Sequence, residues 1–339
     1  DGVDDFFNGQ INFASTGGNA RIIKIGNETF TIGGNRDNST ARLEVREGTV
    51  VLAKDSSALV HAIGANMIIG DATPGEKIVR LGGTFTSAGN NIPANFNDQI
   101  FRTSILTINQ NGVLDLNGYT ESFDYMVGTG LITNRAVASL SSLIVGDNNF
   151  NGAGRTFDGS IQDGAGGGRI GLIKTGDQTL TLTNGGSSYT GPSVFAKATT
   201  QLIGNGALTG TESVSIDRGA TLLLNNDNTT VVNRINDAVA LMMNRGTFTL
   251  RGALAANPNK TISESLGAFS ISSFNVVRLD NSGAGGSGYV AGSNLQLNFS
   301  SYNRNPGGQV AFVEQSSDGS AGFIATNPAG STSKITLGT

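Results

Sequence analysis

Two neighbouring carboxylates are the first residues whose types and spacing could do chemistry. Asp158 and Asp163 lie close together in a glycine-rich stretch, and each precedes a glycine. Glycosidases hold two carboxyl groups about 5–10 Å apart across the scissile bond, so this pair is the candidate for cleavage of a polysaccharide. An Asp beside Gly is more typical of a turn in which the carboxylate bonds its own backbone. The chain also has no Trp and 5 Tyr to form a sugar platform, so we favour turn residues and expect no catalytic residue.

Metal and nucleophile chemistry finds little support. His61 is the single histidine and there are no cysteines, which excludes a two-histidine or thiolate metal site. No GxSxG nucleophile motif occurs. Loops at Asp1 to Asp5 and at Asp147 to Asn149 offer oxygen ligands for a loose Ca²⁺ site, but the EF-hand spacing is missing. We therefore expect His61 at an ordinary strand or loop position and no resident metal or cofactor.

Two glycine patterns match the dinucleotide-binding motif GxGxxG. They are Gly166-Gly168-Gly171 and Gly283-Gly285-Gly288. A genuine site needs a strand before the glycines and a helix after them, whose N-terminus faces the pyrophosphate. No helical pattern follows either match, so both are interpreted as chance hits in a chain with 49 glycines.

The composition favours a packed, uncharged structure. Of 339 residues, 37% are hydrophobic and 14% charged, with a net charge of −4, whereas disordered chains combine low hydrophobicity with high net charge. No Lys/Arg run offers a phosphate backbone an electrostatic footprint, so we expect no nucleic acid partner. No stretch approaches the ~20 apolar residues of a membrane helix, so we expect no membrane insertion within this segment.

Short runs of alternating apolar residues, broken by glycine, dominate the chain and predict half-buried strands. One pattern recurs, in which two inward apolar residues are followed by a polar turn with Gly and then by further inward residues. It is found at Leu43-Val45-Gly48-Val51, Leu106-Ile108-Gly112-Leu114-Leu116, Val214-Ile216-Gly219-Leu222-Leu224 and Leu241-Met243-Gly246-Phe248-Leu250. Repetition at about 20–50 residues is typical of solenoids. Aligned Asn side chains could form ladders along such a coil.

Two alternatives to a coil remain at this stage. Asn111-Gly112 between alternating runs is a hairpin signal, which would favour an antiparallel β-sandwich or hairpin repeats. The spacing of Val232, Ile235, Val239 and Met242 fits one face of a helix, so a short helix is the alternative there. We prefer a solenoid because strand signals continue past the ~250–300 residues at which a compact core would divide.

Residues 171–203 carry a more specific pattern. Lys174-Thr175-Gly176 is followed by the alternating strand Thr179 to Leu182, and Tyr189-Thr190-Gly191 comes next. This order closely resembles the autotransporter-associated β-strand repeat. Ala198-Thr199-Thr200 departs from the family, which usually has Gly there, so we expect a remodelled third turn. We further expect positive φ at Gly176 and Gly191, and a Tyr189 that covers a corner with its hydroxyl in water.

The resemblance implies an all-β, right-handed parallel β-helix that a Gram-negative-type bacterium exports and displays, and it implies no catalytic residue. We expect one continuous, elongated solenoid over residues 1–339, with the repeat at about 171–203, as part of a longer polypeptide. The predicted function is that of a non-enzymatic structural or adhesive surface protein. Its predicted partners are further copies of itself, in an oligomer or fibre, and surface glycans or neighbouring cells. The alternatives are a carbohydrate-active β-helix enzyme and a trimeric recognition fibre.

Overall fold

The computed structural model describes residues 4–13, 20–83, 95–146, 154–227, 229–252, 261–281, 294–315, 321–323 and 333–338. The chain forms two compact units, Asp1–Leu172 and Ile173–Thr339. Within the described residues both units consist of strands, corners and loops without a helix, so the all-β prediction is confirmed. For these residues, accordingly, no helix has the length and apolar character that crossing a bilayer requires.

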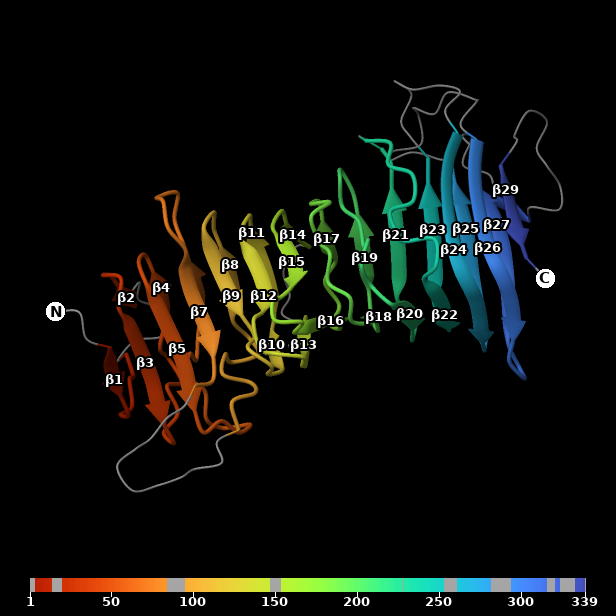
Figure 1. Ribbon diagram of the computed structural model, residues 1–339. Helices are drawn as coiled ribbons and strands as arrows, with labels where there is room; N and C mark the ends of the chain where they lie inside the picture. Colours follow the sequence, from red (N-terminus) through yellow and green to blue (C-terminus); the bar gives the residue numbers. More distant parts are fainter. Residues whose placement is uncertain are drawn as a thin grey trace. The chain divides into compact units, whose positions relative to one another are not determined.

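Three sheets form the first unit (Figure 1). Sheet 1 contains, in spatial order, β1 (Asp5–Phe7), β3 (Thr29–Gly34), β5 (Thr49–Lys54), β7 (Lys77–Leu81), β9 (Gly112–Asp115), β12 (Leu131–Asn134) and β15 (Ser160–Asp163). Sheet 2 contains β2 (Ile22–Lys24), β4 (Leu43–Val45), β6 (Met67–Ile69), β8 (Ile105–Ile108), β11 (Tyr125–Gly128) and β14 (Arg155–Phe157). Sheet 3 contains β10 (Glu121–Phe123), β13 (Leu140–Val145) and β16 (Arg169–Lys174), the last of which runs past the end of the unit.

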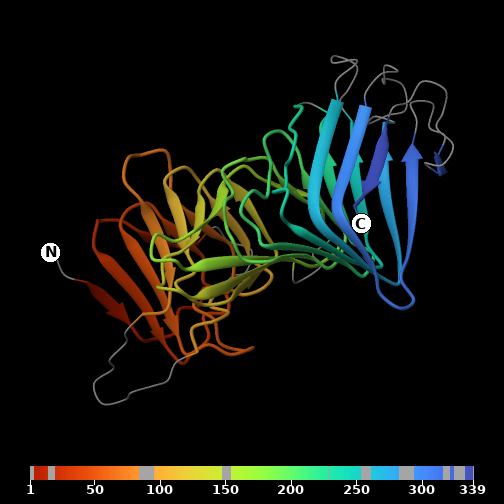
Figure 2. The same ribbon diagram turned by 45° about the vertical axis from the view of Figure 1, so that its right-hand side comes forward.

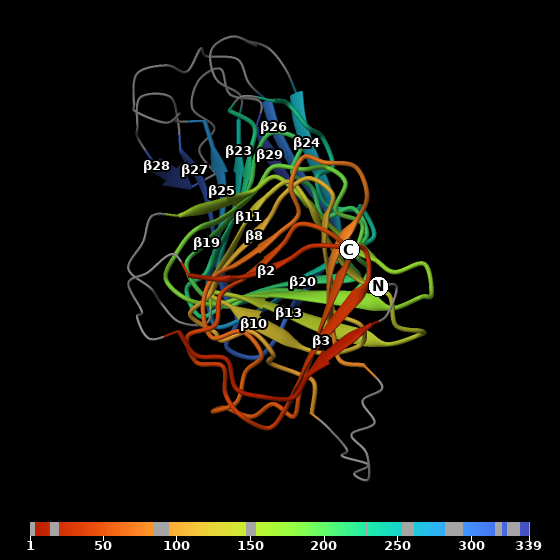
Figure 3. The same cartoon turned by 90° about the vertical axis from the view of Figure 1, so that its left-hand side faces the viewer.

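The chain visits these sheets in turn, and each circuit is one rung of a coil. From β8 onwards a rung passes through sheet 2, sheet 1 and sheet 3, as in β8, β9 and β10. Earlier rungs have loops in place of the third strand. In Figure 3, strands of all three sheets of this unit are labelled. Neighbouring rungs pair in parallel, and Leu43 aligns with Met67 and Met67 with Leu106. Because these steps are unequal, the rungs carry loops of different length, as the uneven sequence repeat predicts.

The second unit is built from two sheets. Sheet 4 contains β17 (Leu180–Leu182), β19 (Thr199–Leu202), β21 (Thr221–Asn225), β23 (Thr247–Arg251), β25 (Phe274–Asp280), β27 (Gln309–Gln315) and β28 (Ala321–Phe323). Sheet 5 contains β18 (Ser193–Phe195), β20 (Ser213–Asp217), β22 (Ala240–Asn244), β24 (Thr261–Ser272), β26 (Asn294–Arg304) and β29 (Lys334–Leu337). Figure 2 shows the long strands of these sheets in the cyan to blue part of the chain. All their described pairings are parallel except that of β28 on β27.

The predicted inward residues form the core. In the rung of β8 and β9, Leu106, Ile108, Leu114 and Leu116 are fully buried. In the second unit Leu222 and Leu224 align with Phe248 and Leu250, all of them buried. The parallel solenoid is therefore confirmed, and each buried column continues from rung to rung.

Both alternatives to the coil are wrong. Asn111-Gly112 joins β8 of sheet 2 to β9 of sheet 1, so it is a corner of the coil and no hairpin. Its geometry resembles a hairpin turn because Asn111 has a φ of 63°. The segment with helical spacing forms a loop that leads into β22. Ile235 and Val239 of the loop are buried, whereas Val232 of the loop and Met242 of β22 are exposed. Because Val232 and Met242 are exposed, the helix-like spacing does not correspond to one buried face.

Candidate functional site

The carboxylates of the enzyme hypothesis lie on either side of one strand along the chain. Asp158 precedes β15 and Asp163 ends it, so a strand lies between them. Asp163 Oδ1 accepts a hydrogen bond of 3.0 Å from the Ile170 amide. This is the backbone-bonding role that a turn Asp is expected to have.

The glycine and calcium candidates are no more organised. Gly166 and Gly168 lie in the turn between β15 and β16, and Gly171 lies within β16, so a strand follows the motif. Asp4 Oδ1 accepts a bond from the Thr29 amide, and Asp5 belongs to β1. Across the part of the chain that the structure describes, no three His, Asp or Glu side chains are grouped to hold a metal ion. The second glycine match, Asp1 and the Asp147 to Asn149 loop lie outside the described residues.

The 171–203 segment forms four strands, β16 to β19, joined by corners. Gly176 has a φ of 65°, as expected, whereas Gly191 is not among the described residues with positive φ. At the third turn, Ala198 takes a φ of 54° directly before β19. Alanine thus holds the left-handed conformation for which glycine is the usual residue.

The expectation for Tyr189 is wrong. Its side chain is buried, and its hydroxyl lies 2.7 Å from Ser193 Oγ, far from bulk water. Ser193 Oγ is 2.9 Å from Thr211 Oγ1, which donates to the carbonyl of Gly191. Burial raises the pKa of Tyr189 well above its usual value, while the bond to Ser193 opposes the shift. The buried hydroxyls of Ser193 in the same rung and Thr211 in the next rung replace the water that sequence reasoning assigned to this group.

Buried lysines are a recurrent feature that sequence reasoning missed. The Lys174 ammonium donates to the carbonyls of Thr175 and Gly176, and that of Lys24 donates to the equivalent carbonyls of Ile25 and Gly26. Lys77 is also buried and donates to three carbonyls and one hydroxyl in residues 73–75. A Lys-x-Gly pattern at Lys24 and Lys174 was the available signal. These ammonium groups close glycine corners and are not placed for catalysis.

His61 lies in a loop, as expected, but it is buried between two carboxylates. Its ring nitrogens face Asp37 and Asp98. Ser122 Oγ donates to Asp98 at 3.0 Å. Because both ring nitrogens face carboxylates, the imidazole does not activate this serine as a nucleophile.

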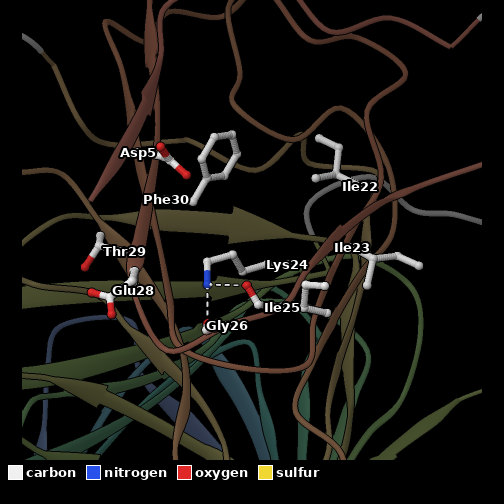
Figure 4. A pocket seen from close by; sticks show the side chains of 9 residues that line it. All are labelled: Asp5, Ile22, Ile23, Lys24, Ile25, Gly26, Glu28, Thr29 and Phe30. Carbon is white, nitrogen blue, oxygen red and sulfur yellow. Dashed lines mark hydrogen bonds between the residues drawn. The ribbon is translucent and has the colours of Figure 1, made fainter. Parts of the chain in front are cut away.

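The candidate interaction site is a hollow at the first rung. A cavity of about 780 Å³ opens there between β1, β2 and the start of β3. Figure 4 shows the apolar side chains of Ile22 and Phe30 across this space, with Asp5 and Glu28 on the same side as Phe30. Lys24 enters it with its ammonium on the Ile25 and Gly26 carbonyls. Burial lowers the pKa of Lys24, against an opposing effect of Glu47.

Two edge strands border the hollow. Within the described residues β1 is the edge of sheet 1 and β2 the edge of sheet 2. The Ile22 amide donates to Arg42 O, and Lys24 O accepts from the Arg46 amide, so these two residues bond β4. Alternate residues of a parallel strand bond opposite neighbours, which directs the N–H and C=O of Ile23 away from β4, toward the open edge. The exposed side chain of Ile23 lies at the same place.

The last rung of the second unit has a different edge. β29 is the edge strand of sheet 5 among the described residues, with the half-buried residues Ile335 and Leu337. On sheet 4, β28 pairs antiparallel with Val313 to Gln315 of β27. Part of the sheet 4 edge is therefore covered by β28.

Neither family models, curated proteins nor solved structures contain a match to this chain.

Proposed function

We propose that this chain is a non-enzymatic structural or adhesive β-solenoid of a bacterial surface, whose copies associate through the edge that β1 and β2 form within the described residues. The observation that carries the proposal is the open hollow bordered by β1 and β2. In the proposal the chain belongs to exported passenger-type proteins, as its 171–203 pattern suggests. The self-association needs no catalytic residue.

Backbone pairing supports a mechanical role. Each rung bonds its neighbours through parallel strands, so stability is close to a sum of local rung and interface terms. Such an array resists deformation along its length because each rung between the edges is held on both sides. The acids of the enzyme hypothesis lie at opposite ends of β15, which favours this role over polysaccharide cleavage.

Edge chemistry supports association. An unpaired edge strand presents N–H and C=O groups that a further strand can bond. Ile23 offers one such pair, and the adjacent hollow offers apolar surface from Ile22 and Phe30. A strand that docks there continues sheet 2 and covers the core of the first rung. Exposed Ile25 adds apolar contact at the corner.

The edge is tested with two substitutions of one residue. Ile23→Pro removes an N–H that does not bond β4, and proline is tolerated on edge strands, so the fold should be retained. Ile23→Thr keeps the N–H and β propensity as the matched control. Sedimentation velocity over a concentration series should show association of the wild type and of Ile23→Thr. Ile23→Pro should weaken association by about tenfold, as one lost hydrogen bond predicts.

Two outcomes would contradict the proposal. A wild type that sediments as a monomer at every concentration refutes self-association. Equal association of Ile23→Pro and wild type refutes the edge strand as the contact. Display at the surface is tested separately, by accessibility of the protein to antibody on intact cells of its native bacterium; labelling that requires cell lysis would refute it.

A further inference from the structure

His61 links three successive loops of the first unit. The loops follow β3, follow β5 and precede β8, on the side where the early rungs lack a third strand. His61 Nδ1 lies 3.3 Å from Asp37 Oδ1, and Nε2 lies 3.8 Å from Asp98 Oδ2. The His61 amide also donates to Asp37 Oδ1 at 2.8 Å. One imidazole therefore faces a carboxylate of the preceding loop and another of the following loop.

The surroundings make this contact sensitive to charge. The His61 side chain is 5% exposed, and the edge of its ring packs against Phe101 with 4.9 Å between centroids. Two further charged groups act on the carboxylates. Lys54, whose ammonium donates to Gly9 O, attracts Asp37. Buried Glu121 lies close enough to Asp98 to repel it. Ser122 holds the other oxygen of Asp98. An imidazole ordinarily titrates near neutrality, and burial also lowers the pKa of Lys54 to about 8 and raises that of Glu121 well above its usual value.

We propose that Asp37, His61 and Asp98 form a pH-responsive clasp, which holds the three loops together when His61 is protonated and loosens the Asp98 loop when it is neutral. The imidazolium has an N–H for each carboxylate. The neutral ring has one N–H, so a nitrogen lone pair faces a carboxylate on one side. Asp98 is released first because its contact is longer and its side chain is 41% exposed, against 27% for Asp37.

The direction of the pH effect follows from the shift of His61. Burial lowers the pKa of His61, but the bonds and charges of Asp98 and Asp37 outweigh it and raise the pKa above 6.5. A raised pKa stabilises the folded form fully below the unfolded value, and this stabilisation is lost as the pH rises through the folded value. The clasp is therefore closed in acid and loosened at alkaline pH.

The clasp is tested by NMR titration, which is simple because the chain has one histidine. The single imidazole signal should titrate above 6.5 in the wild type. In Asp98→Asn, the pKa of His61 should be lower by about half a unit or more. Asparagine tolerates the φ of 55° at this position, so the loop should keep its conformation. Asp177→Asn removes an exposed carboxylate of the second unit and should leave the titration unchanged. A wild-type pKa at or below 6.5, or an equal value in Asp98→Asn, would overturn the clasp.

Hydrogen exchange gives an independent readout of the loops. The Ala62 and Ile63 amides donate to Gln99 O, and the Phe101 amide donates to Ile63 O, so all three report contact between the second and third loops. After correction for intrinsic exchange, their protection should fall between pH 6 and 8, by up to about tenfold for each unit by which the pKa of His61 exceeds 6.5. The Asn109 amide, which bonds Ile69 O at a corner, serves as control. An equal fall in wild type and Asp98→Asn would refute the mechanism.

Discussion

Replacement of Asn134 by Ala should destabilise the first unit more than its size suggests. Asn134 ends β12, is fully buried, and bonds the rungs on both sides of its own. Its Oδ1 accepts from the Gly118 amide at 2.8 Å, and its Nδ2 donates to Arg169 O at 2.9 Å. Weaker bonds of 3.2–3.3 Å join it to Ala136 and Ser139. The side chain is thus a cross-link along the coil made of hydrogen bonds.

The expected loss follows from the two short bonds. In Asn134→Ala, the Gly118 N–H and the Arg169 C=O each lose the hydrogen bond to this amide, and the Ala side chain does not replace it. A buried group left unpaired costs ~1–3 kcal/mol, and the lower half of this range applies because Gly118 and Arg169 are half-buried. The two groups together predict a loss of about 2–4 kcal/mol in the free energy of unfolding.

Urea denaturation followed by circular dichroism measures the total, and hydrogen exchange with mass spectrometry assigns it to a unit. Peptides from β9, β12 and β15 should lose protection, while those of the second unit should not. Asn244→Ala is the matched control, since Asn244 ends β22 with an exposed side chain, and it should change stability by less than ~0.5 kcal/mol. If Asn134→Ala cost no more than this control, the amide cross-link would have no energetic role.

Two further substitutions test features of the second unit. Ala198→Gly should stabilise the second unit by up to ~1 kcal/mol in urea denaturation, because glycine adopts the left-handed conformation without the strain that alanine has. Ala240→Gly within β22 is the control and should destabilise the unit by ~0.5–1 kcal/mol. A loss of stability in Ala198→Gly would show that Ala198 is not strained. Burial raises the pKa of Glu264 to about 8, so the folded state binds the extra proton and stability should fall by a few kcal/mol as the pH rises from about 5 to 8. Glu264→Gln, which imitates the neutral acid, should flatten this part of the pH profile measured by thermal denaturation, and a profile parallel to the wild type would refute the assignment.

The fold was predictable because its main signal is local. Inward residues of a strand recur at every second position, and Leu222-Leu224 and Phe248-Leu250 keep this period on both sides of a glycine or polar corner. A coil repeats that signal many times, so errors at single strands matter little. Where a strand is replaced by a loop, as at residues 231–239, burial no longer follows the period, and the pattern falsely suggested a helix.

The polar interior was not predictable, because its partners come from other rungs. Arg234 is fully buried and donates to Gly206 O in the preceding rung and to Asn225 O in its own. Nothing near Arg234 in the sequence identifies Gly206 as its acceptor. Tyr189 failed for the same reason, since Thr211 completes its hydroxyl chain from the next rung. Stacking therefore determines which polar residues are buried, and it is a long-range property.

Two glutamates explain how the coil tolerates rungs with a missing strand. Glu121 in β10 accepts from the successive amides of Gln99 and Ile100, and Glu264 in β24 accepts from those of Arg234 and Ile235, at 2.8–3.2 Å. In each unit the loop so bonded pairs with the preceding rung through one isolated parallel bridge, at Ile100 or Ile235. The carboxyl oxygens thus supply the acceptors that a neighbouring strand would otherwise provide for buried N–H groups. The carboxyl bonds and the bridge hold the same short segment of each loop, so the rest of the loop can vary in length around a regular core.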